Sequence, residues 1–339
     1  MAEKIRIALD AMGGDNGVEI VVAAALDYLS KDASVSLVLC GNEESIKPHL
    51  PGKIPDGISI VHASQEVAMD ELPSKALRNK KDSSMRVAIN QVKEGHADAC
   101  VSAGNTGALM ATARFVLKMI PGIERPAIIT QLPGLVNDTW VLDLGANVDC
   151  TADHLFQFAV MGSELLIATG ERKNPKVGLL NIGQEEIKGN EQVKKANELL
   201  SASELNYIGY VEGDDIYTGD VDLVVTDGFI GNVALKSSEG VAKMIRQRLK
   251  AAFTRGLLSK LAGLIAYPVL KAFAKTIDPR RYNGASLLGL KGIVVKSHGG
   301  VDALAFENAI AVAKTEAQSA VTEHIQEKIT LHMKNGKAD

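Results

Sequence analysis

The sequence contains few cysteines and no pair of cysteines at short range. Three occur among 339 residues, at Cys40, Cys100 and Cys150. An odd count without a CxxC pair argues against a disulfide framework and against a zinc site. All three fall at or near the ends of predicted strands, where a small side chain packs well, so we expect no catalytic cysteine. The chain is expected to function in a reducing compartment.

The sequence also lacks a basic excess, a targeting signal and a long apolar run. Its formal net charge is -4, whereas a nucleic-acid-binding domain usually carries an excess of positive charge. The N-terminal stretch MAEKIRIALDAMGG is typical of a strand that runs into a turn, not of a signal peptide. No apolar run reaches the roughly 20 residues that a spanning helix needs. We therefore expect a cytoplasmic protein that binds no nucleic acid and contacts a membrane only peripherally.

Short apolar runs alternate with longer amphipathic stretches along the chain, and 46% of the residues are hydrophobic. This alternation predicts βαβ units and a mostly parallel sheet in one large or two modest α/β domains. Strands are predicted at residues 5–9, 35–39, 58–62, 99–102, 127–131, 139–143, 177–181, 207–211, 223–226 and 293–296. Helices are predicted at residues 18–30, 84–94, 106–119, 152–169, 191–200, 232–248 and 301–327, with a short helix inside the polar segment 65–84.

Glycine together with asparagine or aspartate follows five of the predicted strands. The five stretches are DAMGGD, AGNTGA, LGANVD, IGQEEIKGN and DGFIGN. Ligands bind beyond the carboxyl ends of the strands in an open parallel sheet, so we expect these turns at one common edge. Each turn taken alone is also compatible with an ordinary connection, because glycine and asparagine tolerate positive φ.

The turn Gly104, Asn105, Thr106 and Gly107 precedes a predicted helix. The free N–H groups at the start of a helix can bind an anion such as phosphate. The alternative is a simple N-cap made by the asparagine or the threonine. The turn matches neither GxxxxGK[ST] nor GxGxxG, so the sequence does not support a nucleotide site of the usual kind.

Three further side chains could act in catalysis. Lys188 lies between a strand end and a helix start, where it could neutralise phosphate or remain a solvated surface lysine. Asn232 could cap its helix or donate its side-chain amide to a developing oxyanion. His298 could bind phosphate or shuttle a proton, although a lone histidine is often structural.

Other chemistries are poorly supported. There is no GxSxG or HExxH motif. Several aspartates could bind Mg²⁺, but most of them are at positions typical of strand ends or helix caps. They are Asp143, Asp149, Asp153, Asp222 and Asp227.

A basic amphipathic segment lies outside the predicted sheet. Residues 253–277 read FTRGLLSKLAGLIAYPVLKAFAKTI, and Pro268 is expected to break them into two helices. Residues 243–281 carry ten basic side chains and one acid, a charge of +9. The segment could contact an acidic protein or anionic lipid, or it could pack in the core or a dimer. The contact residues that we predict are Arg255, Leu258, Lys260, Leu261, Lys271 and Lys275. A second basic cluster, which could supplement either role, consists of Lys75, Arg78, Lys80, Lys81 and Arg86.

Six stretches carry a resemblance to a known family: ALDAMGGD, SAGNTGALM, LDLGANVD, GLLNIG followed by KGNE, VVTDGFIGN and YNGASLLGLKG. They resemble the bacterial phosphate acyltransferases of phospholipid synthesis (the PlsX family), from Ile5 to about Glu327. The resemblance implies one domain over residues 1–339, possessing two lobes, with a protruding hairpin at 253–281. It implies a homodimer of three-layer α/β/α architecture, related to isocitrate and isopropylmalate dehydrogenases and to phosphotransacetylases.

The resemblance also implies a reaction. A long acyl chain would pass from acyl carrier protein to inorganic phosphate, and a membrane glycerol phosphate acyltransferase would use the product. No metal and no nucleotide cofactor is implied. Three rivals stay open: a coenzyme A phosphotransacetylase, a metal- and NAD-dependent hydroxyacid dehydrogenase, and a non-enzymatic membrane-associated scaffold.

A thioester is already activated and phosphate is a competent nucleophile, so positioning and oxyanion stabilisation suffice without a covalent intermediate. We assign phosphate binding to the 104–107 N–H groups together with Lys188, and carbonyl polarisation to Asn232. His298 is a further catalytic candidate. The remaining predicted phosphate contacts are Asn147, Asp149, Gly228 and Gly231.

Overall fold

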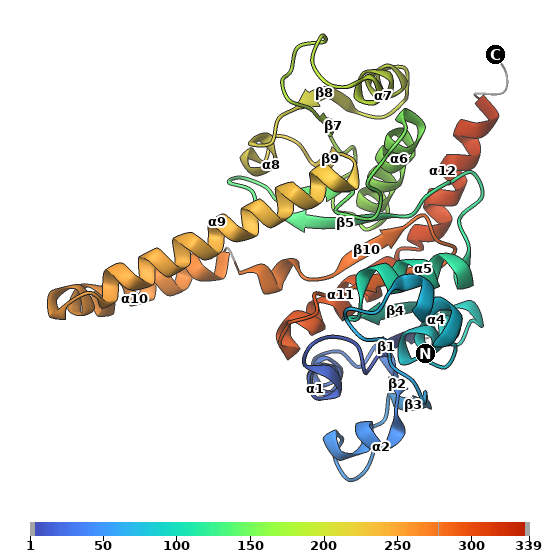
Figure 1. Ribbon diagram of the computed structural model, residues 1–339, viewed down its shortest axis with the longest axis vertical. Helices are drawn as coiled ribbons and strands as arrows, with labels where there is room; N and C mark the ends of the chain where they lie inside the picture. The colour runs from blue at the N-terminus through green and yellow to red at the C-terminus, as the bar shows by residue number, and fades with distance from the viewer. Residues whose placement is uncertain (1–3, 277, 336–339) are drawn as a thin grey trace.

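The computed structural model describes residues 4–276 and 278–335, and one mixed 11-stranded sheet runs through them (Figure 1). Its order is β3-β2-β1-β4-β11-β10-β5-β6-β9-β7-β8. The strands are β1 Ile5–Asp10, β2 Val35–Gly41, β3 Ile58–His62, β4 Ala99–Ser102, β5 Ala127–Leu132, β6 Thr139–Leu142, β7 Val177–Leu180, β8 Tyr207–Val211, β9 Leu223–Val225, β10 Ala285–Leu288 and β11 Ile293–Lys296. All ten predicted strands are present. Strand β10 was not predicted; it is defined by antiparallel pairing with β5 and β11.

Helices cover both faces of the sheet. They are α1 Gly17–Lys31, α2 Glu43–Ile46, α3 Pro73–Asn79, α4 Ser84–Lys93, α5 Thr106–Leu117, α6 Ala152–Ala168, α7 Glu191–Ser201, α8 Asp215–Thr218, α9 Gly228–Thr254, α10 Leu257–Thr276, α11 Ala303–Gln318 and α12 Val321–Asn335. Two predicted boundaries were wrong. The helix predicted at 301–327 is divided near Ala320, which has a φ of 48°, and α9 begins four residues before Asn232.

Three clusters of buried side chains hold the layers together. Helices α1 and α11 pack on one face of the first strands through residues such as Val21 and Phe306. Helices α4 and α5 pack on the opposite face, for example through Leu109. In the other half of the sheet α6, α7 and α12 cover one face, around Phe158. The predicted three-layer α/β/α architecture is confirmed.

The two halves of the sheet run in opposite directions. Strands β1, β4 and β11 are mutually parallel, as are β6, β9 and β7. Between these groups lie three antiparallel pairings, β11 with β10, β10 with β5, and β5 with β6. The carboxyl ends of β1, β4 and β11, which we name the first edge, therefore point opposite to those of β6, β9 and β7, the second edge. The expectation that all five turns share one edge was wrong.

Helices α9 and α10 form a hairpin that projects from the body (Figure 1). The turn lies at Arg255 and Gly256, and α10 continues through Pro268. The prediction that Pro268 breaks the segment was wrong. Proline removes one backbone donor, and in an exposed helix water can bond the carbonyl that loses its partner. Residue 277, inside the predicted hairpin 253–281, lies outside the described residues.

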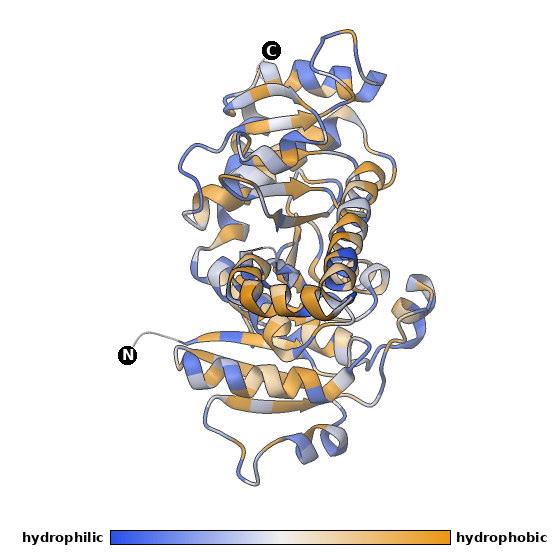
Figure 2. Cartoon of the chain, turned by 90° about the vertical axis from the view of Figure 1, so that its left-hand side faces the viewer, coloured by the Kyte–Doolittle hydropathy of each residue, from blue (hydrophilic) through white to orange (hydrophobic). Residues whose placement is uncertain are grey.

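The sequence was expected to hold no segment of membrane-spanning length, and this also needs correction. By length and composition alone, the region from α10 to Tyr282 passes the test for a spanning helix. None of its apolar window is buried. Figure 2, in which the hairpin points toward the viewer, shows hydrophobic residues along it. A single helix of this kind is weak support for a span, but it does show an unusual amount of exposed apolar surface.

Candidate active site

Hydrogen bonds within the protein join the loops of the first edge, although the buried Oδ1 of Asp10 has no hydrogen-bond partner among the described residues. Asp10 at the end of β1 is buried and accepts a 2.6 Å hydrogen bond from the Ser102 hydroxyl. The same hydroxyl accepts the backbone N–H of Gly104 at 3.1 Å. Burial raises the pKa of Asp10, against hydrogen bonds that lower it. A Cβ on Gly13 would come within 2.8 Å of the Gly104 nitrogen, so two backbones meet here without room for a ligand.

The start of α5 at the first edge is also occupied by protein. Asn105 caps the helix, accepting from the Ala108 N–H at 2.9 Å. Its amide nitrogen donates to the carbonyls of Met69 and Glu71 at 2.8 and 3.0 Å. Gly107 packs against the ring of Pro73, where a Cβ would lie 2.9 Å from Cγ, and Thr106 is exposed. The N-cap alternative is therefore what the structure shows for Asn105.

Lys296 is a buried cation at the first edge that the sequence analysis missed. Its ammonium donates to the Ala103 carbonyl at 3.2 Å and to that of Ser297. Burial lowers its pKa to about 8, and the nearby charges of Asp10 and Asp15 oppose this. The signal available in the sequence was a lysine at the end of the apolar run IVVK. A charged residue in a buried strand is rare and therefore notable.

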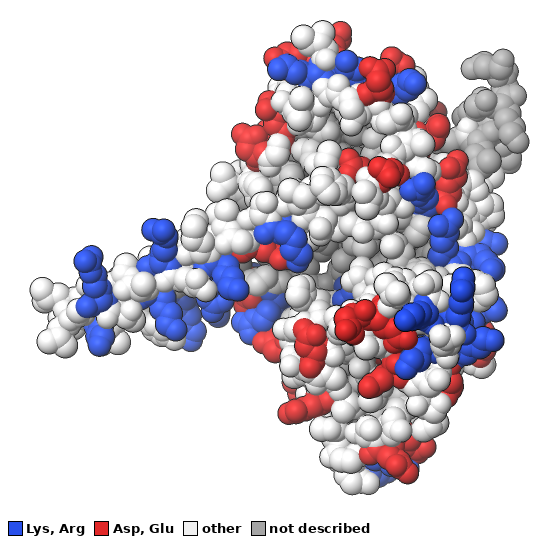
Figure 3. All heavy atoms as spheres, in the orientation of Figure 1, with Lys and Arg blue, Asp and Glu red and all other residues white. Residues whose placement is uncertain are grey.

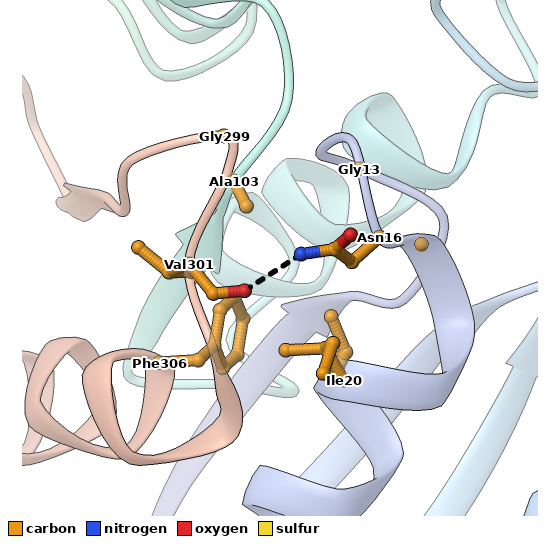
Figure 4. A pocket seen from close by; sticks show the side chains of 9 residues that line it. Gly13, Asn16, Ile20, Ala103, Gly299, Val301 and Phe306 are labelled. Atoms are coloured by element: carbon orange, nitrogen blue, oxygen red, sulfur yellow. Dashed lines mark hydrogen bonds between the residues drawn. The ribbon is translucent and has the colours of Figure 1, made fainter.

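His298, two residues further on, is exposed and folds back on its own loop. Its Nδ1 accepts the Gly300 N–H at 3.4 Å, and its own N–H donates to Asn283 at 2.9 Å. The cavity beside this loop is lined by Gly13, Asn16, Gly299 and Val301 among others (Figure 4). Its volume of about 10 Å³ has room for one water molecule. It cannot hold phosphate or an acyl chain.

The second edge begins with a buried aspartate that organises the turn after β6. Asp143 accepts the N–H groups of Ile128, Ala146 and Asn147 at 3.1, 2.9 and 2.8 Å. The Asn147 amide also donates to Asp143 and to the Pro126 carbonyl, at 2.8 and 2.7 Å. Burial raises the pKa of Asp143. Asn147 therefore holds the turn together, and its amide donors are already used.

Gly228 and Gly231 let α9 start directly on this turn. Both are buried, and the Gly228 N–H donates to the Asn147 carbonyl at 2.7 Å. A Cβ on Gly231 would lie 1.9 Å from the Asp143 carbonyl oxygen. A Cβ on Gly228 would lie 2.7 Å from the Asn147 carbonyl oxygen, so backbone packing accounts for both glycines.

Asn232, by contrast, is exposed and lies beside Gly145. A Cβ on Gly145 would be 3.5 Å from that of Asn232. The helix is capped by Asp227, which accepts from the Ile230 N–H at 3.0 Å, so Asn232 is not the cap. Within the described residues the Asn232 amide has no hydrogen-bond partner. Asp149 is exposed too, and its carbonyl accepts from Arg125 at 2.9 Å.

Lys188 lies in the loop after β7, which is next to β9 in the sheet. It is half-buried and packs against Gly183, and Asn190 caps the following helix. In the part of the chain that the structure describes, its ammonium has no acidic partner. Close by, the buried amide nitrogen of Asn181 has no hydrogen-bond partner. Lys188 and Asn232 therefore share the second edge, each with donors left free.

The first and second edges are too far apart to share one small ligand. Strands β4 and β7 are six positions apart in the sheet, about 29 Å at the usual strand spacing. One phosphate ion therefore cannot contact both the 104–107 turn and Lys188 within a protomer, and that part of the predicted mechanism was wrong. His298 likewise lies at the edge opposite to Lys188 and Asn232.

Three of the five candidate aspartates form local contacts, whereas Asp149 and Asp153 are exposed. Asp222 pairs with Arg172 at 2.6 Å, and Asp143 and Asp227 are used as described above. Among the described residues, no group of three or more His, Cys, Asp or Glu side chains is placed to hold a metal ion. Burial raises the pKa of Cys150 to about 12, and Cys40 and Cys100 are buried.

The predicted contact residues of the hairpin are all exposed. Leu258 and Leu261 are 84% and 56% exposed, which is far above the usual value for leucine. Arg255, Lys260 and Lys275 have no acidic partner within the described residues, and the Lys271 ammonium lies 5.9 Å from the Tyr267 ring centroid.

Comparisons with known proteins agree with the motifs. A sequence model of the family described as fatty acid synthesis protein matches residues 5–324. The phosphate acyltransferase of Methylococcus capsulatus is 63% identical over 96% of this chain and 96% of its own length. Among solved structures, a phosphotransacetylase from Streptococcus pyogenes has a TM-score of 0.66 at 18% identity, covering 94% of this chain and 95% of its own. A 4-hydroxythreonine-4-phosphate dehydrogenase from Klebsiella pneumoniae has a TM-score of 0.52 at 14% identity, covering 94% and 99%.

The structural likenesses support the predicted relation of the fold to phosphotransacetylases and to dehydrogenases. The sequence match spans nearly the whole chain at high identity and agrees with the motif resemblance. The chain therefore belongs to the phosphate acyltransferase family.

Proposed function

We propose that the chain transfers a long-chain acyl group from acyl carrier protein to inorganic phosphate, and that the acyl phosphate product serves phospholipid synthesis. The observation that carries the proposal is the 63% identity to a phosphate acyltransferase over 96% of both chains. The phosphotransacetylase-like fold supports it, since acyl transfer to phosphate needs an anion site and no nucleotide fingerprint.

The reaction balances without a cofactor. An oxygen of the phosphate dianion attacks the thioester carbonyl carbon and forms the new C–O bond. The C–S bond then breaks and its electron pair leaves on sulfur. The phosphate hydroxyl proton ends on that thiolate, so the products are acyl phosphate and the free carrier thiol.

We assign the chemistry to the second edge. Lys188 would neutralise phosphate as a point charge, and the Asn232 amide would donate to the carbonyl oxygen as negative charge develops on it. Supporting this assignment, both side chains follow neighbouring parallel strands and both keep free donors. Asp149 and the Asn147 turn would border the site, and Asn147 would position the turn instead of binding phosphate directly.

The reaction itself is the test. Purified protein with hexadecanoyl acyl carrier protein and phosphate should release acyl phosphate, trapped as a hydroxamate, at a rate that saturates with phosphate. Without phosphate, the intact mass of the protein should stay unchanged. An acyl-sized mass increase would establish a covalent route, and equal rates with coenzyme A thioesters would favour the phosphotransacetylase alternative.

For the hairpin, we propose contact with an anionic membrane surface by a protein that is otherwise cytoplasmic. Exposed leucines and unpaired cations on the same helix are typical of interfacial binding, and the product is destined for a membrane glycerol phosphate acyltransferase. The homodimer implied by the family resemblance is also part of this proposal. The exposed apolar side chains of α9, such as Val241 and Ile245, are available for it.

Charge reversal tests the hairpin. The triple variant Lys260→Glu, Lys271→Glu and Lys275→Glu should lose most of its binding to vesicles containing anionic lipid, because each cation near such a surface contributes about 1 kcal/mol. Its melting temperature should not change, since none of these side chains is buried. Vesicle binding equal to that of the wild type in a co-sedimentation assay would leave only the packing explanation.

A further inference from the structure

A second basic surface lies on the body of the molecule, over α3, α4 and the end of α5. We name it the α3–α5 face. Figure 3 shows lysine and arginine gathered over α4 and α5. Its basic residues are Lys75, Arg78, Lys80, Lys81, Arg86, Arg114 and Lys118.

The cations of the α3–α5 face are not neutralised by the protein. None of the seven lies within 4.0 Å of a carboxylate in the described residues. Elsewhere on the surface, lysines and arginines such as Lys31, Arg172 and Lys314 have acidic partners. Asp82, the acid inside this segment, is held by the Ser64 hydroxyl and N–H at 2.6 and 2.8 Å. The face therefore presents its charge to solvent.

At its centre is an exposed aromatic ring. Phe115 on α5 is 51% exposed. The Arg86 guanidinium lies 5.4 Å from the ring centroid and the Lys118 ammonium 4.7 Å from it. An aromatic anchor flanked by cations has the composition of a protein-binding hot spot.

Lys118 occupies a backbone conformation that favours glycine. Its φ of 68° and ψ of 170° lie in a region that is nearly exclusive to glycine. A helix that ends in positive φ usually has glycine there, so a lysine costs stability at this position.

One end of the α3–α5 face, at Phe115 and Lys118, lies toward the second edge, whereas α3 begins at the first edge, where Pro73 packs against Gly107. Helix α5 starts at the first edge after β4 and runs back across the sheet, so Phe115 and Lys118 lie toward the opposite side. The Lys118 carbonyl accepts the N–H of Lys291, just before β11, at 3.0 Å. Seven residues after Lys118, Arg125 bonds the carbonyl of Asp149 in the proposed active site.

The hairpin tip is less suitable for delivering a thioester. Arg255 follows Asn232 by 23 residues along α9, about 35 Å at the rise of an α-helix. Cations at the tip are therefore far from the proposed active site.

We propose that the α3–α5 face is the docking surface for the acidic carrier protein that delivers the acyl thioester. This inference rests on the proposed function. The unpaired cations steer the acidic partner and set its orientation, while Phe115 is buried in the contact. The hairpin, with its many exposed leucines, would contact the membrane.

Two variants test the docking surface, with one control. Lys118→Gly removes a cation and relieves the backbone, so it should melt at or above the wild-type temperature, while Phe115→Ala removes the anchor. Each should weaken the binding of fluorescently labelled holo acyl carrier protein about tenfold and raise the KM for its hexadecanoyl thioester equally, with kcat unchanged. Lys53 is exposed, lies elsewhere on the surface and has no acidic partner among the described residues, so Lys53→Glu should bind like the wild type.

The outcomes separate the inference from the proposed function. Wild-type affinity for the carrier protein in both variants would overturn the docking surface. So would a loss of vesicle binding without a loss of carrier binding, since this would assign the face to lipid. If the wild type binds the carrier through this face but forms no acyl phosphate, the proposed function fails while the docking surface stands.

Discussion

The first and second edges of the sheet carry similar glycine-rich turns, but they use them differently. At the first edge, Asn105 and Lys296 are hydrogen-bonded within the protein, and so is one carboxylate oxygen of Asp10. At the second edge, the Asn147 amide is also hydrogen-bonded within the protein, while the side chains of Asn232 and Lys188 have no hydrogen-bond or acidic partner among the described residues. A glycine turn can thus serve close packing or ligand access, and the hydrogen bonds of its neighbours distinguish the two.

The largest expected effect concerns the second edge. Lys188→Ala and Asn232→Ala should each lower kcat/KM about 10²–10³-fold, because a positioned donor or cation is lost where charge develops. Neither side chain is buried, so the melting temperature should stay within a few degrees of the wild type. Initial rates with hexadecanoyl acyl carrier protein and differential scanning calorimetry give both readouts.

Asn105→Ala is the matched change at the first edge. It should destabilise the protein by about 1–2 kcal/mol, since a helix cap is lost, and leave turnover per folded molecule near normal. This distinction between the two edges is contradicted if Lys188→Ala and Asn232→Ala keep normal turnover while Asn105→Ala loses it. In that case the first edge is the active one.

A smaller effect is expected where the two halves of the sheet join. Glu316 on α11 is buried and bonds the Ser286 hydroxyl of β10. Burial raises its pKa to about 7, so the folded protein holds a proton that the unfolded chain releases above about pH 4.5. The bound proton therefore contributes fully to the free energy of unfolding below about pH 4.5, and this contribution is lost as the pH rises to about 7. Glu316→Gln should reduce the pH dependence of the free energy of unfolding, and it should stabilise the protein by up to about 3 kcal/mol at pH 8.

Chemical denaturation at pH 5, 6, 7 and 8 measures this difference. The free energy of unfolding of the wild type should fall relative to that of Glu316→Gln between pH 5 and 7. Above pH 7 the difference between the two should stay constant. Parallel curves from pH 5 to 8 would mean that Glu316 titrates as an ordinary acid in the folded protein.

Much of the fold was predictable because its signals are local. Buried strands such as residues 99–102 are continuous apolar runs, and helix caps such as Asn190 precede their helices in the sequence. What failed depended on context. Pro268 does not break α10, since its environment is solvent, and β10 is defined by pairing with β5 and β11, which are distant or reversed partners that a local pattern does not reveal.

The candidate site was only partly predictable. Asn232 and Lys188 were selected as residues after strand ends, and the structure brings them to the same edge. Gly228 and Gly231 were selected by the same rule, but they are buried against the turn after β6. Lys296 was missed because its burial depends on strands and loops distant in sequence.

The sequence by itself determined the family, the alternation of strands and helices, and the identity of the residues after each strand. Those follow from motifs and from local periodicity. Only the tertiary structure decided which of these residues can meet. The reversal of direction through β10, β5 and β6 separates the 104–107 turn from Lys188, and pairing direction is fixed by contacts between distant strands that no local pattern encodes.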